Sequence, residues 1–242
     1  GPEAHRLPVA LGEIRLRAGE RIPCRILQRM IGQFAHDLRF SRPHAISSSG
    51  REYSLAVIVD DEGRPVATPD RVRRVVSIVP SLTEAVACTD RTVLVGATEW
   101  CTHPADLDVT RIGGTKNPDV AAIVELAPDL VVANQEENRR PDLDALRAAG
   151  VPVYVTDVRT LDDAFGSLAR MLLACGITRP AWLDDAERAW AAVPEPAVRR
   201  RAVVPIWRRP WKAVGRDTFT GAVLARLGVD NALCDDPERY PR

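Results

Sequence analysis

The chain has 242 residues with 33 basic and 33 acidic side chains, so its formal net charge is zero. This balance excludes a polycation that coats nucleic acid or anionic lipid, and we expect neither as a partner. Apolar residues make up 45% of the chain and charged residues 27%, proportions that exclude disorder of the whole chain. No run of 18 apolar residues is present, so no membrane-spanning helix is expected.

The cysteines and the first residues indicate the cellular compartment in which the protein is expected. Five cysteines without a C-x-x-C spacing argue against a disulfide framework or a closed zinc site. Residues 1–6 lack a basic stretch followed by an apolar segment, so the sequence as written predicts a cytoplasmic protein. A periplasmic or extracellular location is the alternative if a signal was removed.

Residues 1–73 match neither of the units that follow, and we assign them as an N-terminal extension of unknown role. Within them, residues 21–38 have the pattern of an amphipathic helix, residues 47–50 that of a flexible turn and residues 55–59 that of a strand. No motif that carries chemistry is visible in this extension.

Residues 74–160 alternate short apolar runs with helical patterns, which is typical of βαβ units on a parallel sheet. They predict a first α/β lobe. Ser81 and Glu84 have the spacing of a capping box at a helix start. Asn117 is expected to cap a second helix, and Gly150 to end a third. The predicted strands are 75–79, 92–98, 130–133 and 151–156.

Residues 161–198 form a predicted helical connection. Thr160 and Asp163 begin a helix whose apolar stripe extends to Cys175, and residues 180–192 give a second helical stretch. A new α/β unit follows in residues 199–242, with a strand over 202–207, a loop over 208–217 and a helix over 218–227. One strand and one helix cannot enclose a core, so this second lobe is expected to be incomplete. Either the chain continues past Arg242, or residues 1–73 or a second copy, in a homo-oligomer, cover the exposed sheet.

Three polar clusters follow predicted strands of the first lobe, at the edge where open α/β sheets bind ligands. The first holds Glu99, Trp100, Cys101 and His103. In an extended loop the thiol and the imidazole would project together as a soft donor pair. A buried thiol beside a histidine that caps a turn explains the same residues equally well.

The second and third clusters contain no recognised catalytic motif. Residues 113–118 form a glycine turn before a helix, which could receive a carboxylate or phosphate or be a plain loop. Residues 134–140 include two glutamates that ordinary solvated helix-start acids would also explain.

A fourth cluster, in the second lobe, combines two indoles with two guanidiniums in the segment WRRPW, residues 207–211. Such a segment can stack on a flat ligand and pair with its carboxylates, although core packing of Trp207 is the alternative. No Ser/His/Asp or Cys/His catalytic order is visible, so we expect a binding protein, not an enzyme.

Together these residues resemble the helical-backbone class of metal-complex receptors, which serve as the substrate-binding components of corrinoid ABC importers. The resemblance covers residues 60–242. Its signal-less subgroup, with Cys-x-His-Pro, Gly-Thr-Lys and Glu-Glu-Asn motifs, looks closest. The motifs that carry the resemblance are DDEGRPV (60–66), RVVSIVPSLTE (74–84), WCTHP (100–104), GTKNP (114–118) and APDLV (127–131).

The resemblance implies a bilobed periplasmic-binding-protein-like α/β fold with chelatase-like lobes joined by one long helix, within residues 161–192, and a ligand in the cleft between them. It places Trp100 near the aromatic residue that packs on a corrin ring. Lys116 and Asn117 stand where a second such aromatic residue is usual, and Ala121 where a glutamate docks on a transporter. A docking residue in the second lobe would lie past Arg242.

We therefore interpret the chain as a receptor for a corrinoid, cobalamin-like, or other metal-chelate small molecule, and as a candidate substrate-binding component of an ABC importer with a permease partner. A metal held directly would be bound by Cys101 and His103. One alternative is a cytoplasmic metal-binding protein or metalloenzyme accessory that uses Cys101, His103 and Glu137 as an open site for a transition metal. Another is an interaction module that recruits a partner through residues 1–73. The candidate ligand-binding residues are Glu99, Trp100, Thr115, Lys116, Asn117, Glu136, Glu137, Asn138, Trp207, Arg208 and Trp211.

Overall fold

The computed structural model describes residues 44–46 and 52–242. The predicted helix over 21–38 and the predicted turn over 47–50 lie outside these residues. Within the described part of the chain, no helix is both long and apolar enough to cross a membrane.

The first lobe is built on a five-stranded sheet in the order β6-β5-β4-β7-β8, in which every neighbouring pair is parallel. The predicted parallel α/β architecture is thereby confirmed, as are its four predicted strands. The additional edge strand, β6, has only two residues, too few for a recognisable pattern. The strand bounds are β4 Val75–Ser77, β5 Leu94–Ala97, β6 Thr110–Arg111, β7 Leu130–Asn134 and β8 Val153–Thr156.

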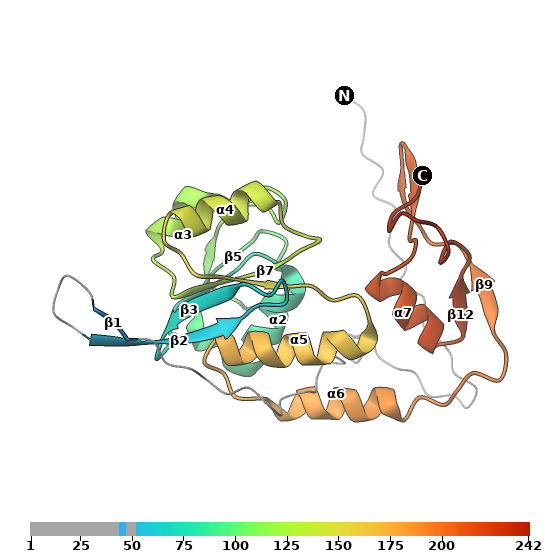
Figure 1. Cartoon of the computed structure of the whole chain (residues 1–242), viewed down its shortest axis with the longest axis horizontal. Coiled ribbons are helices and arrows are strands. Elements are labelled where there is room, and N and C mark those ends of the chain that lie inside the picture. Colours follow the sequence, from blue (N-terminus) through green and yellow to red (C-terminus); the bar gives the residue numbers. More distant parts are fainter. Residues whose placement is uncertain (1–43, 47–51) are drawn as a thin grey trace.

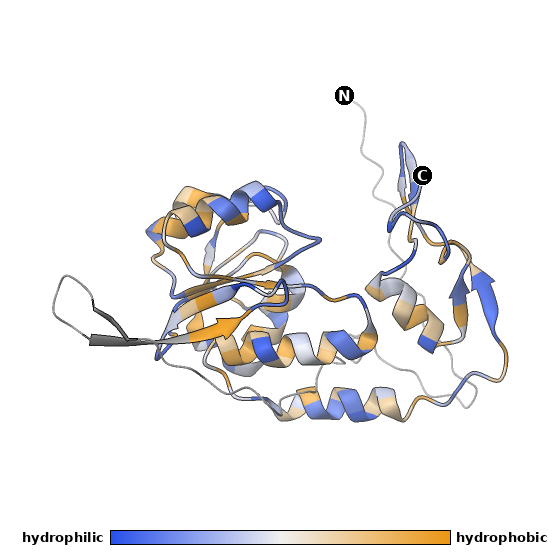
Figure 2. Ribbon diagram, viewed as in Figure 1, coloured by the Kyte–Doolittle hydropathy of each residue, from blue (hydrophilic) through white to orange (hydrophobic). Residues whose placement is uncertain are grey.

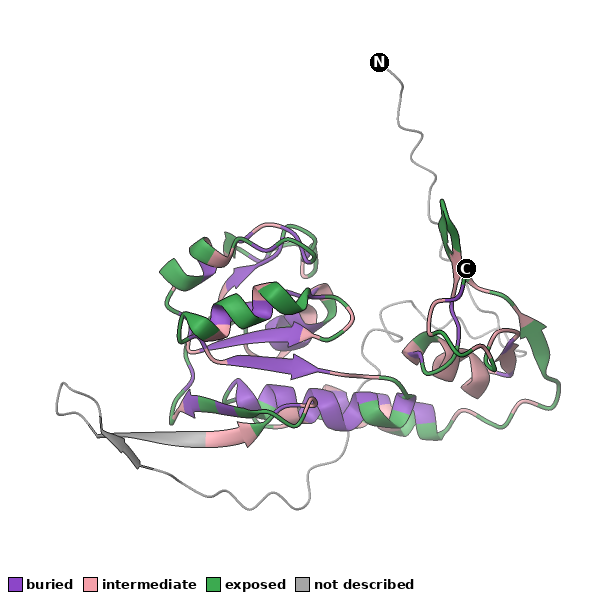
Figure 3. Cartoon of the chain, turned by 45° about the horizontal axis from the view of Figure 1, so that its top comes forward, coloured by how far each residue is buried: buried purple, intermediate pink, exposed green. Residues whose placement is uncertain are grey.

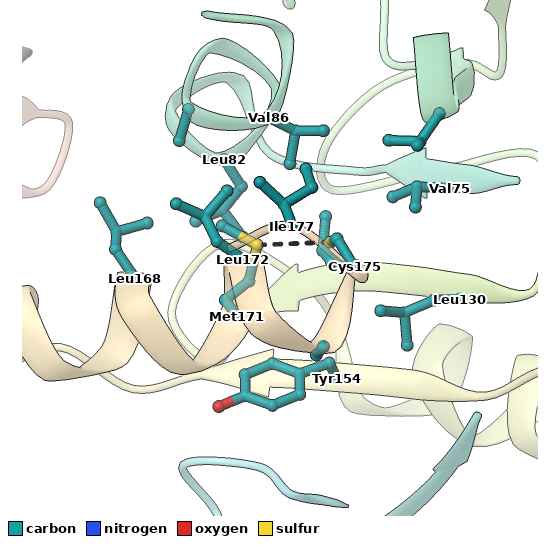
Figure 4. Packing of buried hydrophobic residues seen from close by; sticks show 14 of the residues in the cluster. Val75, Leu82, Val86, Leu130, Tyr154, Leu168, Met171, Leu172, Cys175 and Ile177 are labelled. Atoms are coloured by element: carbon teal, nitrogen blue, oxygen red, sulfur yellow. Dashed lines mark hydrogen bonds between the residues drawn. The ribbon is translucent and has the colours of Figure 1, made fainter. Parts of the chain in front are cut away.

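Helices cover both faces of this sheet, which is why its central strands are apolar throughout. Helices α2 (Pro80–Asp90) and α5 (Leu161–Ala174) pack on one face, and α3 (Val120–Glu125) and α4 (Arg140–Ala148) pack on the other (Figure 1). Hydrophobic and hydrophilic residues alternate along α4 and α5, as amphipathic helices require (Figure 2). Apolar side chains of α2, α5 and the strands pack together on the face of the sheet that these two helices cover (Figure 4).

The helix starts correct two of the predictions. The first predicted capping box is wrong, because α2 already begins at Pro80 and the side chain of its N-cap, Val79, caps no amide of the first turn. Asp119, not Asn117, caps α3 by accepting a hydrogen bond from the amide of Ala122 at 3.0 Å. The capping box of Thr160 and Asp163 at the start of α5 is confirmed.

A three-stranded antiparallel sheet precedes the first lobe and packs against it. It consists of β1 (His44–Ile46), β2 (Glu52–Val59) and β3 (Pro65–Pro69). Val66 and Val72 belong to the core formed by α2, α5 and the sheet. Residues 57–73 are therefore part of this lobe's packing, although the sequence analysis set them apart with the N-terminal extension.

The turn between β2 and β3 is fixed by one buried carboxylate. Asp61 accepts hydrogen bonds from Arg170 Nη2 at 2.6 Å, from the amide of Asp157 at 3.1 Å and from the hydroxyl of Ser167. These bonds tie the turn to α5 and to the segment that follows β8. These hydrogen bonds replace the hydration that a buried carboxylate loses.

The connection between the lobes is a pair of helices where the resemblance implied one long helix. Helix α5 ends near Gly176, which has a φ of +74°, and α6 (Ala181–Ala191) runs back beside α5 (Figure 1). A left-handed residue ends a helix, and Pro180 then starts the next segment. Leu161, Phe165 and Trp190 of this pair form a small core with Phe219 and Val223 of the second lobe.

The second lobe contains two two-stranded sheets and helix α7 (Phe219–Arg226) among its described residues. β9 (Arg200–Ala202) pairs in parallel with β12 (Val229–Asn231), and β10 (Pro205–Arg208) pairs antiparallel with β11 (Trp211–Ala213). The predicted strand over 202–207 is therefore divided between two sheets, and the predicted loop contains β11. Buried residues concentrate in the first lobe and α5, whereas the second lobe is mostly intermediate or exposed (Figure 3).

Candidate functional site

The loops after β5, β6 and β7 meet at one edge of the parallel sheet. The amide of Glu99 donates to the carbonyl of Gly113 at 2.9 Å, which joins the first loop to the second. Lys116 Nζ donates to the carbonyl of Glu136 at 2.5 Å, which joins the second loop to the third. All three loops leave the carboxyl ends of strands, so the structure brings the three sequence clusters together.

Trp100 is the most prominent side chain at this edge, with 68% of its surface exposed. Gly114 lies beside it: a Cβ at Gly114 would be 3.5 Å from the indole Nε1 and 2.5 Å from Asn117 Oδ1. The short distance to Asn117 shows that the turn itself excludes a side chain at Gly114, whereas the indole of Trp100 lies at ordinary contact distance. An indole held in the open at a strand edge can stack on a flat ligand.

The loop that carries Trp100 is held in place by buried hydrogen bonds beneath it, to the body of the first lobe. The thiol of Cys101 is buried, with 1% exposure, and lies 3.0 Å from Thr83 Oγ1 and 3.1 Å from Thr98 Oγ1. Arg111 Nη1 donates to the carbonyls of Thr98 and Cys101 at 3.0 and 2.9 Å. The sequence analysis did not identify Arg111, which has no distinguishing motif.

The predicted donor pair of Cys101 and His103 is not assembled. His103 is exposed and its Nδ1 lies 3.2 Å from Thr102 Oγ1, whereas the Cys101 thiol points into the lobe. Across residues 44–46 and 52–242, no group of three or more His, Cys, Asp and Glu side chains could hold a metal ion. The structure therefore does not bring Cys101, His103 and Glu137 together as an open metal site.

Asn138 joins the loop after β7 to the loop after β6 and to the end of β4. It is buried; its Oδ1 accepts from the amide of Asn134 at 2.9 Å, and its Nδ2 donates to the carbonyls of Ile78 and Thr115 at 3.3 and 2.9 Å. Both protons of the amide are used in these internal bonds. The structure thus gives Asn138 and the buried Thr115 a positioning role, where the sequence analysis placed them against a ligand.

The side chain of Glu136 contacts two residues of the second lobe. Its Oε1 accepts from the hydroxyl of Tyr240 at 2.5 Å and lies 2.8 Å from Arg239 Nη2. Burial and the hydrogen bond to Glu136 raise the pKa of Tyr240 to about 12. Lys116 also pairs with Glu137 Oε2 at 3.8 Å, so two predicted ligand residues already contact each other.

The second-lobe tryptophans lie on the hairpin of β10 and β11, with 63% and 61% of their surfaces exposed. Trp207 pairs with Lys212, and Arg208 pairs with Trp211. Because directly paired residues share a face and successive residues alternate, Trp207 and Trp211 lie on opposite faces of the hairpin. A single ligand can therefore stack on only one of them, which corrects the expectation that both cover the same ring.

A cavity of about 570 Å³ lies away from this edge, between α5, α6 and α7. Leu161, Phe165 and Trp190 form its apolar wall, and Arg226 lies beside them. Arg226 Nη2 is already committed to backbone carbonyls of Trp190 and Val193. The cavity marks the joint between the connecting helices and the second lobe.

Comparison with known proteins finds similar sequences and similar structures. No family model matches the chain. Vitamin B12-binding proteins of Pectobacterium carotovorum and Pectobacterium atrosepticum are 24% and 29% identical over 184 and 187 residues, which is 70% of this chain. The structure of a periplasmic haem-binding protein from Roseiflexus superposes with a TM-score of 0.59 at 23% identity, covering 70% of this chain and 69% of that one. The chain is therefore similar in sequence to vitamin B12-binding proteins and similar in fold to a periplasmic haem-binding protein.

The chain has a bilobed α/β fold with a parallel sheet flanked by helices, as the superposed structure does. It spans 65% of the length of the two Pectobacterium relatives. The similarity to the solved structure thus supports the fold alone.

Proposed function

We propose that the chain is a receptor that binds a metal chelate with a flat ring, a corrinoid or a haem-like molecule, at the carboxyl edge of the first-lobe sheet. The observation that carries this proposal is the exposed Trp100 indole, which an anchored loop holds at the edge where parallel α/β sheets bind ligands. The curated relatives are named for vitamin B12 binding, and the superposed structure for haem binding.

The remaining groups divide the work of recognition. Trp100 covers the ring, and one of Trp207 and Trp211 meets it from the second lobe. Lys116 and Arg208 pair with the carboxylates or amides of the ligand, and the exposed Glu99, Asn117 and Glu137 border the same edge. His103, exposed beside Trp100, is the residue that could reach the metal of the ligand, which arrives as part of the cargo.

Optical titration tests the proposal directly, because cobalt and iron chelates change their absorption spectra when their surroundings change. The purified chain is titrated with hydroxocobalamin, haemin and a ferric siderophore. We expect a saturable change with one of them at a stoichiometry of one. No saturable change with any of the three removes the proposal.

The two hairpin tryptophans provide a matched pair of variants for the same titration. They have almost the same exposure but opposite faces, so only one of Trp207→Ala and Trp211→Ala should weaken binding. Equal weakening by both would show that the loss comes from the hairpin as a whole.

We propose a role in an ABC importer as well, which the sequence resemblance to substrate-binding components of corrinoid importers implies. The superposed structure is described as periplasmic, so the importer role requires an extracytoplasmic chain. Ala121 is exposed on α3, where a glutamate would dock on a transporter by resemblance. Stimulation of permease ATPase activity by the loaded chain tests this role, and Ala121→Glu should strengthen it. A chain that remains in the cytoplasm in cell fractionation contradicts it.

A further inference from the structure

The two lobes touch through a small group of polar side chains at the edge of the candidate site. Glu136 follows β7 in the first lobe, and Arg239 and Tyr240 lie near the end of the second lobe. The carboxylate of Glu136 accepts a hydrogen bond from Tyr240 at 2.5 Å and pairs with Arg239 at 2.8 Å. One carboxylate thus holds both a phenol and a guanidinium from the other lobe.

The first-lobe side of this contact is held in place by its own loop. Asn134 Oδ1 accepts from the amides of Glu136 and Glu137 at 3.0 and 3.2 Å, which forms a tight turn. Lys116 Nζ donates to the carbonyl of Glu136 at 2.5 Å. The position of the Glu136 backbone is therefore set before any contact with the second lobe.

The second-lobe side is held as firmly. The carbonyls of Arg239 and Pro241 accept from the amides of Gly215 and Ala213 at 2.8 and 3.0 Å. A Cβ at Gly215 would be 2.3 Å from the carbonyl oxygen of Glu238, so only glycine allows this close approach. These bonds fasten the terminal segment to β11, the strand that begins with Trp211.

The contact is also shielded from water. The side chains of Glu136 and Arg239 are 27% and 24% exposed, less than most of the chain's surface ion pairs. A partly desolvated, charge-assisted bond is stronger than an exposed pair. Two rigid anchors joined by such a bond define a fixed spacing between the lobes.

We propose that Glu136, Tyr240 and Arg239 form an interlobe clasp that fixes the spacing of the two lobes in the ligand-free protein and controls access to the candidate site. A ligand enters and leaves when the clasp opens. Loss of the clasp broadens the distribution of distances between the lobes while each lobe remains folded. The control of access rests on the proposed function; the effect on spacing does not.

The chain provides its own labelling sites for the test. Cys88 on α2 and Cys234 in the second lobe are exposed, whereas Cys101 and Cys175 are buried. With Cys24→Ser as background, spin labels on Cys88 and Cys234 report the interlobe distance by double electron–electron resonance. The experiment is carried out without ligand on the full chain, on Glu136→Ala and on Tyr240→Phe, with Glu238→Gln as the control because Glu238 is exposed and makes no contact with Glu136.

We expect a narrow distribution in the parent and the control, and a broad one in Glu136→Ala and Tyr240→Phe. Glu136→Gln keeps a side-chain oxygen that can accept from Tyr240, so it should broaden the distribution less than Glu136→Ala does, a grading that a general loss of folding would not give. Distributions of equal width in the parent and both clasp variants overturn the proposal, as does a broad distribution in the parent.

Binding kinetics then test the control of access. Binding of the chelate is followed by stopped-flow mixing. The association and dissociation rates should each rise about tenfold in Tyr240→Phe, with little change in Kd. Both rates rise because the clasp must open for entry and for exit, and the variant lacks one charge-assisted bond that holds the clasp closed. Unchanged rates with altered spacing overturn the control of access. Absence of any binding by the parent contradicts the proposed function alone and leaves the clasp to be judged by the distances.

Discussion

The side-chain amide of Asn138 donates a hydrogen bond to the backbone carbonyl of Thr115 at 2.9 Å, and so joins the loop after β7 to the loop after β6. The same amide also donates to the carbonyl of Ile78 at the end of β4. Three chain segments that are distant in sequence thus depend on one buried side chain. The shape of the candidate site follows from this residue more than from any group that faces outward.

Asn138→Asp should destabilise the protein by about 3 kcal/mol, because a carboxylate keeps the acceptor but turns both donors into an acceptor facing two carbonyls. Urea unfolding followed by circular dichroism measures the change. Asn117→Asp, an exposed substitution in the neighbouring loop, is the control and should have little effect. Equal unfolding midpoints for the two variants would show that Asn138 does not hold the loops together.

Asp61→Ala should cost about 3–5 kcal/mol of unfolding free energy, because it leaves Arg170 half-buried without its partner and removes the acceptor of Ser167. The exposed pair of Arg91 and Asp106 offers the control: Asp106→Ala should leave stability unchanged within error. Thermal and urea unfolding compare the two variants. A small effect of Asp61→Ala would mean that the β2–β3 turn is dispensable for the lobe.

The raised pKa of Tyr240 gives a pH dependence of known sign. Its pKa in the folded protein is about 12, above the ordinary value near 10 in an unfolded chain. The hydroxyl therefore contributes its full stabilisation below about pH 10 and loses it as the pH rises toward 12. The difference in unfolding free energy between the parent and Tyr240→Phe should be constant at neutral pH and shrink above pH 10. The phenolate absorbance of the variant should lack a component that titrates near pH 12, and loss of a component that titrates near pH 10 instead would contradict the assignment.

The sequence predicted the first-lobe sheet because its strands are uninterrupted apolar runs between helix signals. It also placed the polar clusters at one edge, since the carboxyl ends of parallel strands share an edge. Thr160 and Asp163 were recognisable because a capping box is local. Features of this kind depend on residues within a few positions of one another.

The sequence did not predict the contacts between distant segments. The bonds of Asn138 to Ile78 and of Tyr240 to Glu136 span 60 and 104 positions, and no local pattern marks either partner. The opposite faces of Trp207 and Trp211 follow only from the pairing register of β10 with β11. Cys101 and His103 have a spacing that suits a donor pair, but Thr83 and Thr98 offer the thiol a buried site.

Calorimetric titration of the parent chain and of Trp100→Ala with the chelate that gives the optical change tests the central claim most directly. Trp100 is exposed and contributes little to the core, so its removal should leave the fold intact. The account predicts that Trp100→Ala weakens binding about tenfold, the order expected when one stacked aromatic contact is lost. Binding of equal affinity in a folded Trp100→Ala variant would contradict it.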